Sequence, residues 1–287
     1  MHINKLHSHE DYITHQESNF KNNQLLKILE NKLQDKLLTH EEFLLDGYSW
    51  TAQKNSQFLI DSQYANHNEI NFRERLVCNK THLNNRVRGC IHILESYFKA
   101  KTNDNIYMTE QFSILAKWMG KKYHNLYLSE YLNDCSVATK VKLYFRNFMQ
   151  SLNHQDLTKL TYPENSFDFT LSFDCLEHVP NYKMALKEIY RTLKPNGTLL
   201  FSVPFDINSK RHLIRATIEE GKIKHLTKPE YHGNPVSKTG CLSFYTFGWD
   251  ILTELRNVGF KDAYLLLYWS EKYAYLGGEQ ILICAEK

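Results

Sequence analysis

Residues 154–204 alternate between hydrophobic and polar positions in a way that predicts a strand, a helix and a second strand. Turn-forming residues precede a β-prone apolar run at residues 169–173, as expected of a buried strand. Apolar side chains then recur at helical spacing from Tyr182 to Leu193. A Pro-Asn-Gly turn ends that helix and leads into a strand at residues 198–203. Two strands joined by a helix predict a right-handed crossover in a parallel sheet.

The same periodicities predict further elements of an α/β fold. Strands are expected at residues 105–109, 125–129, just before Asp156, 263–269 and 279–285, and helices at residues 85–100, 111–122, 136–150 and 246–257. Gly277 and Gly278, before the last strand, predict a tight turn.

Leucines on one face of residues 22–38 predict an amphipathic helix. This helix is expected to pack on the rest of the chain or on a second copy in a homodimer, through Leu25, Leu26, Leu29, Leu33 and Leu37.

These elements divide the chain into three parts. Residues 1–45 comprise a polar, His-rich arm, expected to be loosely ordered, and the amphipathic helix. Residues 46–100 are irregular and end in a helix, and residues 101–287 form the α/β domain. Within that domain residues 206–245 interrupt the regular alternation, and insertions of this length are uncommon unless functional. We therefore expect this insertion to serve as a lid and as a wall for a substrate.

Composition narrows the class of protein. With 42% hydrophobic residues among 287, the chain can form a real core, and a net charge of +3 gives no sign of nucleic-acid binding. The longest apolar run, Ala263 to Trp269, is too short to cross a bilayer, and the first residues lack the apolar core of a signal peptide. Six scattered cysteines show no disulfide or metal spacing. We expect a cytoplasmic protein without a metal, a membrane partner or a nucleic-acid partner.

Four short motifs, in this order and spacing, resemble the second half of class I S-adenosylmethionine-dependent methyltransferases. They are Asp156-Leu157, Phe167-Asp168 at the start of a strand, Leu176-Glu177-His178-Val179, and Leu193-Lys194-Pro195-Asn196-Gly197. The resemblance implies a Rossmann-like seven-stranded sheet with an N-terminal helical and irregular accessory region. It also implies S-adenosylmethionine as the cofactor and a methyltransferase activity.

The resemblance also assigns the cofactor residues. Glu130 follows the second strand, where the family binds the ribose hydroxyls, while Asp156 with Leu157 follows the third strand, where the adenine lies. The glycine-rich turn of the family is missing after the first strand, where Glu110 is instead expected to contact the cofactor's ammonium group. Asp174 is expected at the same cofactor. The alternative for Glu130 and Asp156 is a capping or solvated carboxylate at a strand end.

Candidate catalytic residues follow the fourth strand, where this fold places its acceptor chemistry. Asp174 and His178 lie there, and a histidine has a pKa suited to taking a proton from a hydroxyl group. The alternative for His178 is packing against the next helix. From the insertion we add His232, within the run Tyr231 to Pro235, whose alternative is a turn positioned by aromatic packing.

Residues 47–88 resemble a small zinc knuckle that precedes some bacterial methyltransferase domains. Ser49, Ala52 and Thr81 occupy three of the four cysteine positions, and only Cys78 remains. One thiolate cannot hold zinc in a tetrahedral site. We expect a knuckle without metal, the alternative being that His67 or His82 replaces a missing ligand.

Two functions follow from these observations. The first is methyl transfer from S-adenosylmethionine to an oxygen or nitrogen atom of a small-molecule or sugar-like acceptor. The second is a non-catalytic methyltransferase-like protein that acts through protein–protein contacts, favoured by the missing cysteines and glycines. Loss of activity on replacing Glu130 or Asp156 separates the two.

Overall fold

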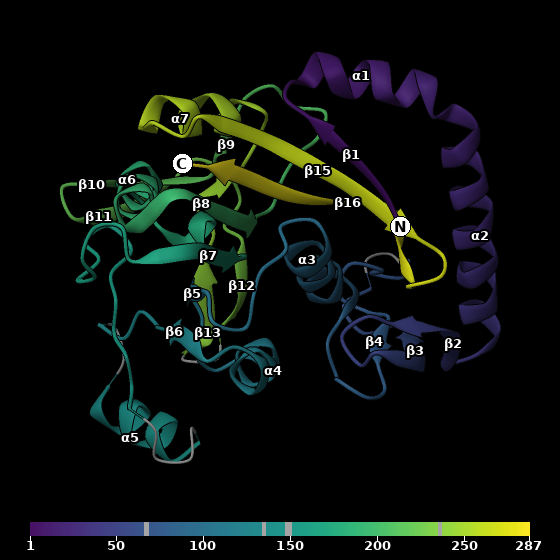
Figure 1. Cartoon of the computed structure of the whole chain (residues 1–287), viewed down its shortest axis with the longest axis horizontal. Coiled ribbons are helices and arrows are strands. Elements are labelled where there is room, and N and C mark those ends of the chain that lie inside the picture. Colours follow the sequence, from purple (N-terminus) through teal and green to yellow (C-terminus); the bar gives the residue numbers. More distant parts are fainter. Residues whose placement is uncertain (66–68, 134–135, 147–150, 235–236) are drawn as a thin grey trace. The chain divides into compact units, whose positions relative to one another are not determined.

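The computed structural model describes residues 1–65, 69–133, 136–146, 151–234 and 237–287. They form two compact units, which are described separately (Figure 1). One unit comprises residues 1–101 and 265–282, and the other comprises residues 102–264 and 283–287.

A seven-stranded mixed sheet is the main element of the fold. In hydrogen-bonded order its strands are β1 (His2–Leu6), β15 (Asp262–Ser270), β16 (Tyr275–Glu286), β8 (Leu193–Ser202), β7 (Phe167–Phe173), β5 (Asn105–Met108) and β6 (Asn125–Leu128). β5 pairs in parallel with β6 and β7, and β7 with β8, whereas β8 and β16 are antiparallel. The predicted Rossmann-like α/β fold is confirmed. The chain runs from β5 to β6 on one side and then crosses to β7 and β8 on the other, so the carboxyl ends of β5 and β7 form a topological switch point.

Four α-helices accompany these strands in the described part of the second unit. They are α4 (Ile114–Lys122), α5 (Val137–Arg146), α6 (Tyr182–Thr192) and α7 (Asp250–Val258), and α6 lies beside α7 (Figure 1). α6 begins where Asn181 Oδ1 accepts a hydrogen bond from Met184 N, and it buries Ala185, Leu186 and Ile189 on one face. The buried face of α6 has the spacing that the sequence predicts.

The strand expected before Asp156 is shorter than predicted. Among residues 151–155, which the structure describes, His154 forms a bridge with Glu130. The segment before it is polar and mostly exposed, so it supplies little apolar surface to extend pairing with β6.

The predicted insertion consists of short antiparallel pairs. Its strands are β9 (Leu213–Ile214), β10 (Ala216–Glu219), β11 (Lys222–His225), β12 (Tyr231–Asn234), β13 (Ser237–Leu242) and β14 (Tyr245–Thr246). β10 and β11 form a hairpin whose turn residues, Glu220 and Gly221, both have positive φ. Pro235, at the end of the candidate acceptor run, lies outside the described residues.

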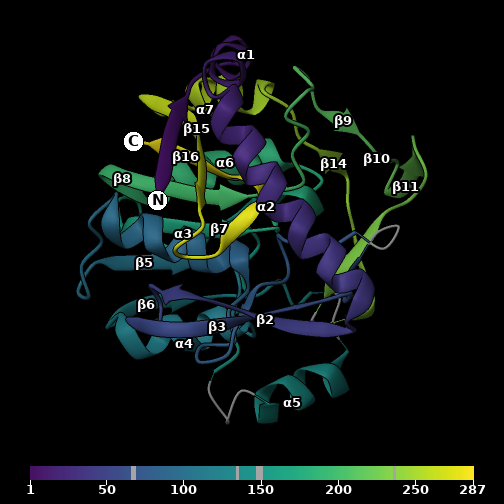
Figure 2. The same cartoon turned by 90° about the vertical axis from the view of Figure 1, so that its right-hand side faces the viewer.

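The first unit is built around α2 (Phe20–Thr39). This helix follows α1 (His9–Ser18) and leads to β2 (Glu42–Ser49) and β3 (Lys54–Asp61), as Figure 2 shows. β2 and β3 form a three-stranded sheet with β4 (Val77–Cys78), which Figure 1 labels. Leu26 and Leu33 of α2 are buried in one cluster with Phe43 and Phe58 of this sheet. The predicted amphipathic helix therefore packs on its own chain, although Leu25, assigned to the same face, is exposed.

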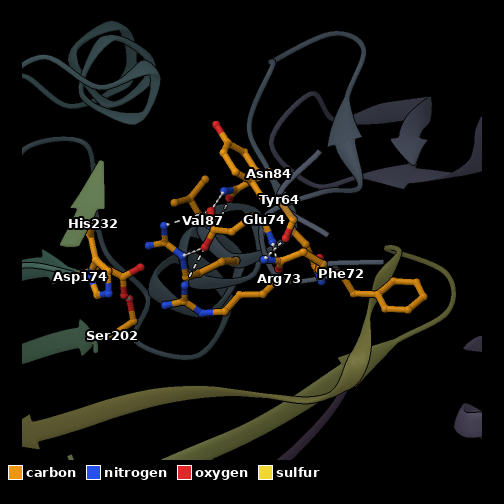
Figure 3. Close-up of polar contacts among 12 residues, drawn as sticks. Tyr64, Phe72, Arg73, Glu74, Asn84, Val87, Asp174, Ser202 and His232 are labelled. Atoms are coloured by element: carbon orange, nitrogen blue, oxygen red, sulfur yellow. Dashed lines mark hydrogen bonds and ion pairs between the residues drawn. The ribbon is translucent and has the colours of Figure 1, made fainter. Parts of the chain in front are cut away.

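The helix α3 (Asn85–Ser96) follows β4 in the same unit. Asn84 Oδ1 accepts a hydrogen bond from Val87 N, and Asn84 Nδ2 donates to Glu74 Oε2 (Figure 3). A polar side chain thus caps this helix and is itself held in place.

Two expectations about the first unit are wrong. Residues 1–20 are not a loose arm, because β1 pairs with β15 and α1 follows it, with His15 buried against Glu279. Gly277 and Gly278 lie within β16, where both backbone N–H groups donate to Glu30 Oε1 at 2.6 and 2.8 Å. Both contacts depend on partners far away in the sequence.

Candidate active site

The carboxyl ends of β5, β6 and β7 bring several predicted site residues to one edge of the sheet. Ser129 N donates to Met108 O at 3.2 Å, which places Glu130 beside the end of β5. Thr109 N donates to Leu171 O at 3.1 Å, so the turn after β5 begins next to β7. Ligands of α/β proteins bind at such an edge.

The surroundings of Glu130 change its acidity. Burial raises the pKa of Glu130 to about 7, and the charge of Glu110 raises it as well. A 3.4 Å hydrogen bond from Gln111 N to Glu130 Oε2 acts in the opposite direction. A carboxylate that titrates near neutral pH at a strand end is typical of a functional site.

Gln111 takes part in ordering the turn that lacks glycines. Its side chain donates to Ser151 O at 2.7 Å and accepts from Asn153 N at 3.1 Å. These bonds join the turn to the segment that pairs with Glu130. The sequence offered one signal for Gln111, its place beside Glu110 in the unusual turn.

Asp156 and Leu157 follow the bridge at His154. Asp156 Oδ1 accepts hydrogen bonds from Thr158 N at 2.8 Å and from the Thr158 hydroxyl at 2.7 Å, and Leu157 is buried. This is the local pattern of an Asx turn, so one carboxylate oxygen has the capping role given above as the alternative.

Asp174, the first residue after β7, has a left-handed backbone with φ of 48°, which is uncommon for a residue other than glycine. Its backbone N donates to Ser202 O at 2.8 Å, and its Oδ1 accepts from Ser202 Oγ at 2.9 Å. Figure 3 draws Asp174 and Ser202 together with His232. Strained backbone held in this way occurs preferentially at functional sites.

Two predicted catalytic histidines meet beside a carboxylate. Glu177 and His178 belong to a single 3₁₀ turn, η1 (Leu176–His178), and His232 comes from β12. Glu177 Oε1 lies 3.7 Å from His178 Nε2 and 3.4 Å from His232 Nδ1, and Glu177 is fully buried. Glu177 and Glu230 raise the pKa of His232 to about 9, although burial alone would lower it.

The insertion holds both imidazole rings from the other side. His178 Nδ1 lies 2.8 Å from Leu242 O, and His232 Nε2 lies 2.9 Å from Glu230 Oε1. Arg215 in turn pairs with Glu230. Glu230 and Arg215 were not singled out for this contact, because only the fold brings the insertion to η1.

The four knuckle positions also come together. Cys78 Sγ lies 3.4 Å from Ser49 Oγ, which accepts a hydrogen bond from Ala52 N at 3.3 Å. Thr51 Oγ1 links Ser49 to Thr81 at 3.2 and 3.3 Å. Hydroxyl groups thus connect the two turns. His67, proposed as a substitute ligand, lies outside the described residues.

Comparison with known proteins identifies the domain. A family profile described as a methyltransferase domain matches residues 111–201. A demethylmenaquinone methyltransferase of Listeria welshimeri is 47% identical over 49 residues, covering 17% of this chain and 20% of that protein. A sterol 24-C-methyltransferase of Gibberella zeae is 33% identical over 86 residues, covering 26% and 23%. The chain thus spans about a fifth of the length of these curated relatives.

Solved structures give similar matches. An S-adenosylmethionine-dependent methyltransferase from Mesorhizobium loti is 16% identical with a TM-score of 0.42, covering 68% of this chain and 96% of that one. Phosphoethanolamine N-methyltransferase 2 of Haemonchus contortus, in complex with S-adenosyl-L-methionine, is 15% identical with a TM-score of 0.41, covering 69% and 51%.

No helix in the described part of the chain combines the length and apolar character that a bilayer crossing requires.

The residues matched by the family profile include β6, β7, α6 and most of β8, together with Glu130, Asp156 and Asp174. This chain therefore carries a methyltransferase domain, which the family profile places at residues 111–201.

Proposed function

We propose that this protein is an enzyme that transfers a methyl group from S-adenosylmethionine to an oxygen or nitrogen atom of a small-molecule or sugar-like acceptor. The cofactor supplies a methyl group that is already activated on a sulfonium centre. The protein therefore has to hold the donor and the acceptor in line and to remove the acceptor's proton.

The residues at the strand ends fit the cofactor. Glu130 offers carboxylate oxygens for the two ribose hydroxyls, and Glu110 offers an anion for the ammonium group. Asp156 would accept from the adenine amine, with buried Leu157 against the ring. Asp174 adjoins this set after β7. The side chains of Thr109, Gln111 and Phe112 are buried in the turn, where the family has glycines.

The acceptor is proposed to bind on the η1 side, under the insertion. His178 and His232 are the catalytic residues that we propose there, with His178 as the group that takes up the acceptor's proton, and their ring centres lie 5.0 Å apart. The insertion supplies both His232 and the partners of each ring. This dual contribution supports its role as a lid and as an acceptor wall.

The proposal also covers the location of the protein and its assembly. The five described cysteines are thiols rather than disulfides, which fits the cytoplasmic location that we propose. Pairing of two copies through α2 stays a prediction.

The observation that carries this proposal is the partly buried Glu130 just after β6, with its raised pKa. Calorimetric titration with S-adenosylhomocysteine, the demethylated product, tests it. We expect micromolar binding that is lost in Glu130→Ala and kept in Glu164→Ala, a matched change of an exposed carboxylate in the same unit. Absence of binding by the unmodified protein would overturn the proposal and favour the non-catalytic alternative.

A further inference from the structure

The carboxylate of Glu177 has an unusual environment. Its side chain is fully buried, and neither of its oxygens accepts a hydrogen bond from any described residue. Buried carboxylates are expected to be paired with hydrogen-bond donors or with a cation. The groups that face Glu177 are instead two ring nitrogens, His178 Nε2 at 3.7 Å and His232 Nδ1 at 3.4 Å.

The opposite nitrogen of each ring has an acceptor as its partner. His178 Nδ1 faces the carbonyl oxygen of Leu242, and His232 Nε2 faces the carboxylate of Glu230. An acceptor can be satisfied only by an N–H group, so these contacts fix the hydrogens on the outer nitrogens. In the neutral rings, the inner nitrogens then direct their lone pairs at Glu177.

Two lone pairs and a carboxylate that face one another require a positive charge between them. A proton on His232 Nδ1 supplies it for one ring only. A divalent ion would serve all three groups, since each offers one ligand atom and these atoms lie within 4.8 Å of one another. Tetrahedral ligands bound at about 2.1 Å are about 3.4 Å apart, close to the distances from Glu177 Oε1.

The contacts of the two ring nitrogens that face away from Glu177 resemble those of histidines that bind metals. Histidine ligands commonly donate their other N–H to a carbonyl or a carboxylate, which fixes the ring and makes the ligand nitrogen more basic. Leu242 and Glu230 provide one partner of each kind, and Arg215 holds Glu230. Such an arrangement around two rings is not needed for an ordinary buried ion pair.

We propose that Glu177, His178 and His232 bind one divalent first-row transition-metal ion, of the type of Zn²⁺ or Mn²⁺. Two imidazoles and one carboxylate are a common ligand set of catalytic metal sites and leave coordination positions open. The His232 side chain is 29% exposed, so the cluster is accessible from solvent on that side. The expected absence of metal rested on cysteine spacing, which says nothing about ligands from η1 and β12.

The role of the ion rests on the proposed methyl transfer. An acceptor hydroxyl bound at an open position would lose its proton more readily, because a metal lowers the pKa of a bound oxygen. With the ion bound, both imidazoles are ligands and the proton leaves to solvent, while the oxygen retains the electron pair that forms the new bond to the methyl carbon. Metal binding itself does not depend on this role and is tested without cofactor.

The test uses the full chain after removal of metals with a chelator. Zn²⁺ and Mn²⁺ are titrated separately by calorimetry, and bound metal per chain is counted by elemental analysis after gel filtration. We expect one ion per chain for at least one of the two metals, with affinity reduced at least a hundredfold in Glu177→Gln and in His232→Gln.

Two control variants test whether metal binds to side chains outside the proposed cluster. His225→Gln changes an exposed histidine of the same insertion, and Cys78→Ser removes the thiol of the knuckle; both should bind metal as the unmodified chain does. Circular dichroism checks folding, and if Glu177→Gln fails to fold, His232→Gln, at a partly exposed position, carries the test.

Three results would overturn the proposal: no stoichiometric binding, equal binding by the folded cluster variants, or loss of binding in either control variant. Titration of the metal-free protein with S-adenosylhomocysteine keeps the two proposals apart. Cofactor binding without metal binding would refute only the metal site, whereas metal binding without cofactor binding would refute only the methyl transfer.

Discussion

Glu130 combines two properties that rarely occur at a solvated strand end. Its carboxylate is partly buried beside Glu110, and its pKa is raised to about 7. Between the ordinary value of 4.5 and 7, the folded chain therefore keeps a proton that the unfolded chain has released. The contribution of Glu130 to stability is present at low pH and is lost as the pH rises through this window.

This raised pKa predicts a pH dependence of cofactor binding. Two ribose hydroxyls need an ionised carboxylate as acceptor, so the affinity for S-adenosylhomocysteine should rise about tenfold between pH 6 and 8. Calorimetric titrations across this range measure it. Glu130→Gln, which stays neutral, should bind weakly and with little dependence on pH. An equal slope in this variant would assign the titration to another group.

The residues of the predicted knuckle lie together although three of the four positions carry no cysteine. Two turns, after β2 and β4, still bring Ser49, Cys78 and Thr81 into one hydrogen-bonded group through Thr51. Buried hydroxyls and a thiol therefore link turns that zinc holds together in the proteins the sequence resembles here.

Restoring the missing cysteines should restore zinc binding. The triple variant Ser49→Cys, Ala52→Cys and Thr81→Cys would present four thiols with Cys78, a complete tetrahedral set. We expect one additional zinc ion per chain by elemental analysis, together with a higher unfolding temperature for the first unit. The same variant with Cys78→Ala should bind that ion far more weakly. Unchanged zinc content in the triple variant would show that the turns no longer have knuckle geometry.

Strands and helices with strong local periodicity could be predicted from the sequence, whereas others could not. β7, α6 and residues 198–202 of β8 have burial patterns set by their own residues, whereas the start of β8 was predicted as a turn. β1 has a polar sequence, and it forms a strand because β15 offers it an edge to pair with. Pairing with a distant edge leaves no local periodicity to detect.

The division into two compact units predicts how a ligand stabilises the whole protein. S-adenosylhomocysteine at a hundredfold excess over its dissociation constant stabilises the bound unit by about 2.7 kcal/mol. Hydrogen exchange that requires opening of this unit should slow about a hundredfold at the amides of β5, β6 and β7, measured by mass spectrometry. The amides of β2 and β3, in the other unit, should change little. Equal protection in both would mean that the units unfold as one.

For the candidate site, too, features set by nearby residues could be predicted from the sequence, and features set by distant residues could not. Glu130, Asp156 and Asp174 could be found from the sequence because each follows a strand or its expected position, and strand ends are local features. Their environments, including the raised pKa of Glu130 and the Asx turn of Asp156, depend on neighbours brought in by folding.

By itself, the sequence determined the α/β class, the parallel crossover from β7 to β8 and the carboxylates after the strands. Each of these follows from residue spacing within a few turns of chain. Only the tertiary structure decided that β1 joins the sheet and that His232 of the insertion faces Glu177 of η1. The physical reason is that such contacts are selected by the packing of the whole core, which no local pattern records.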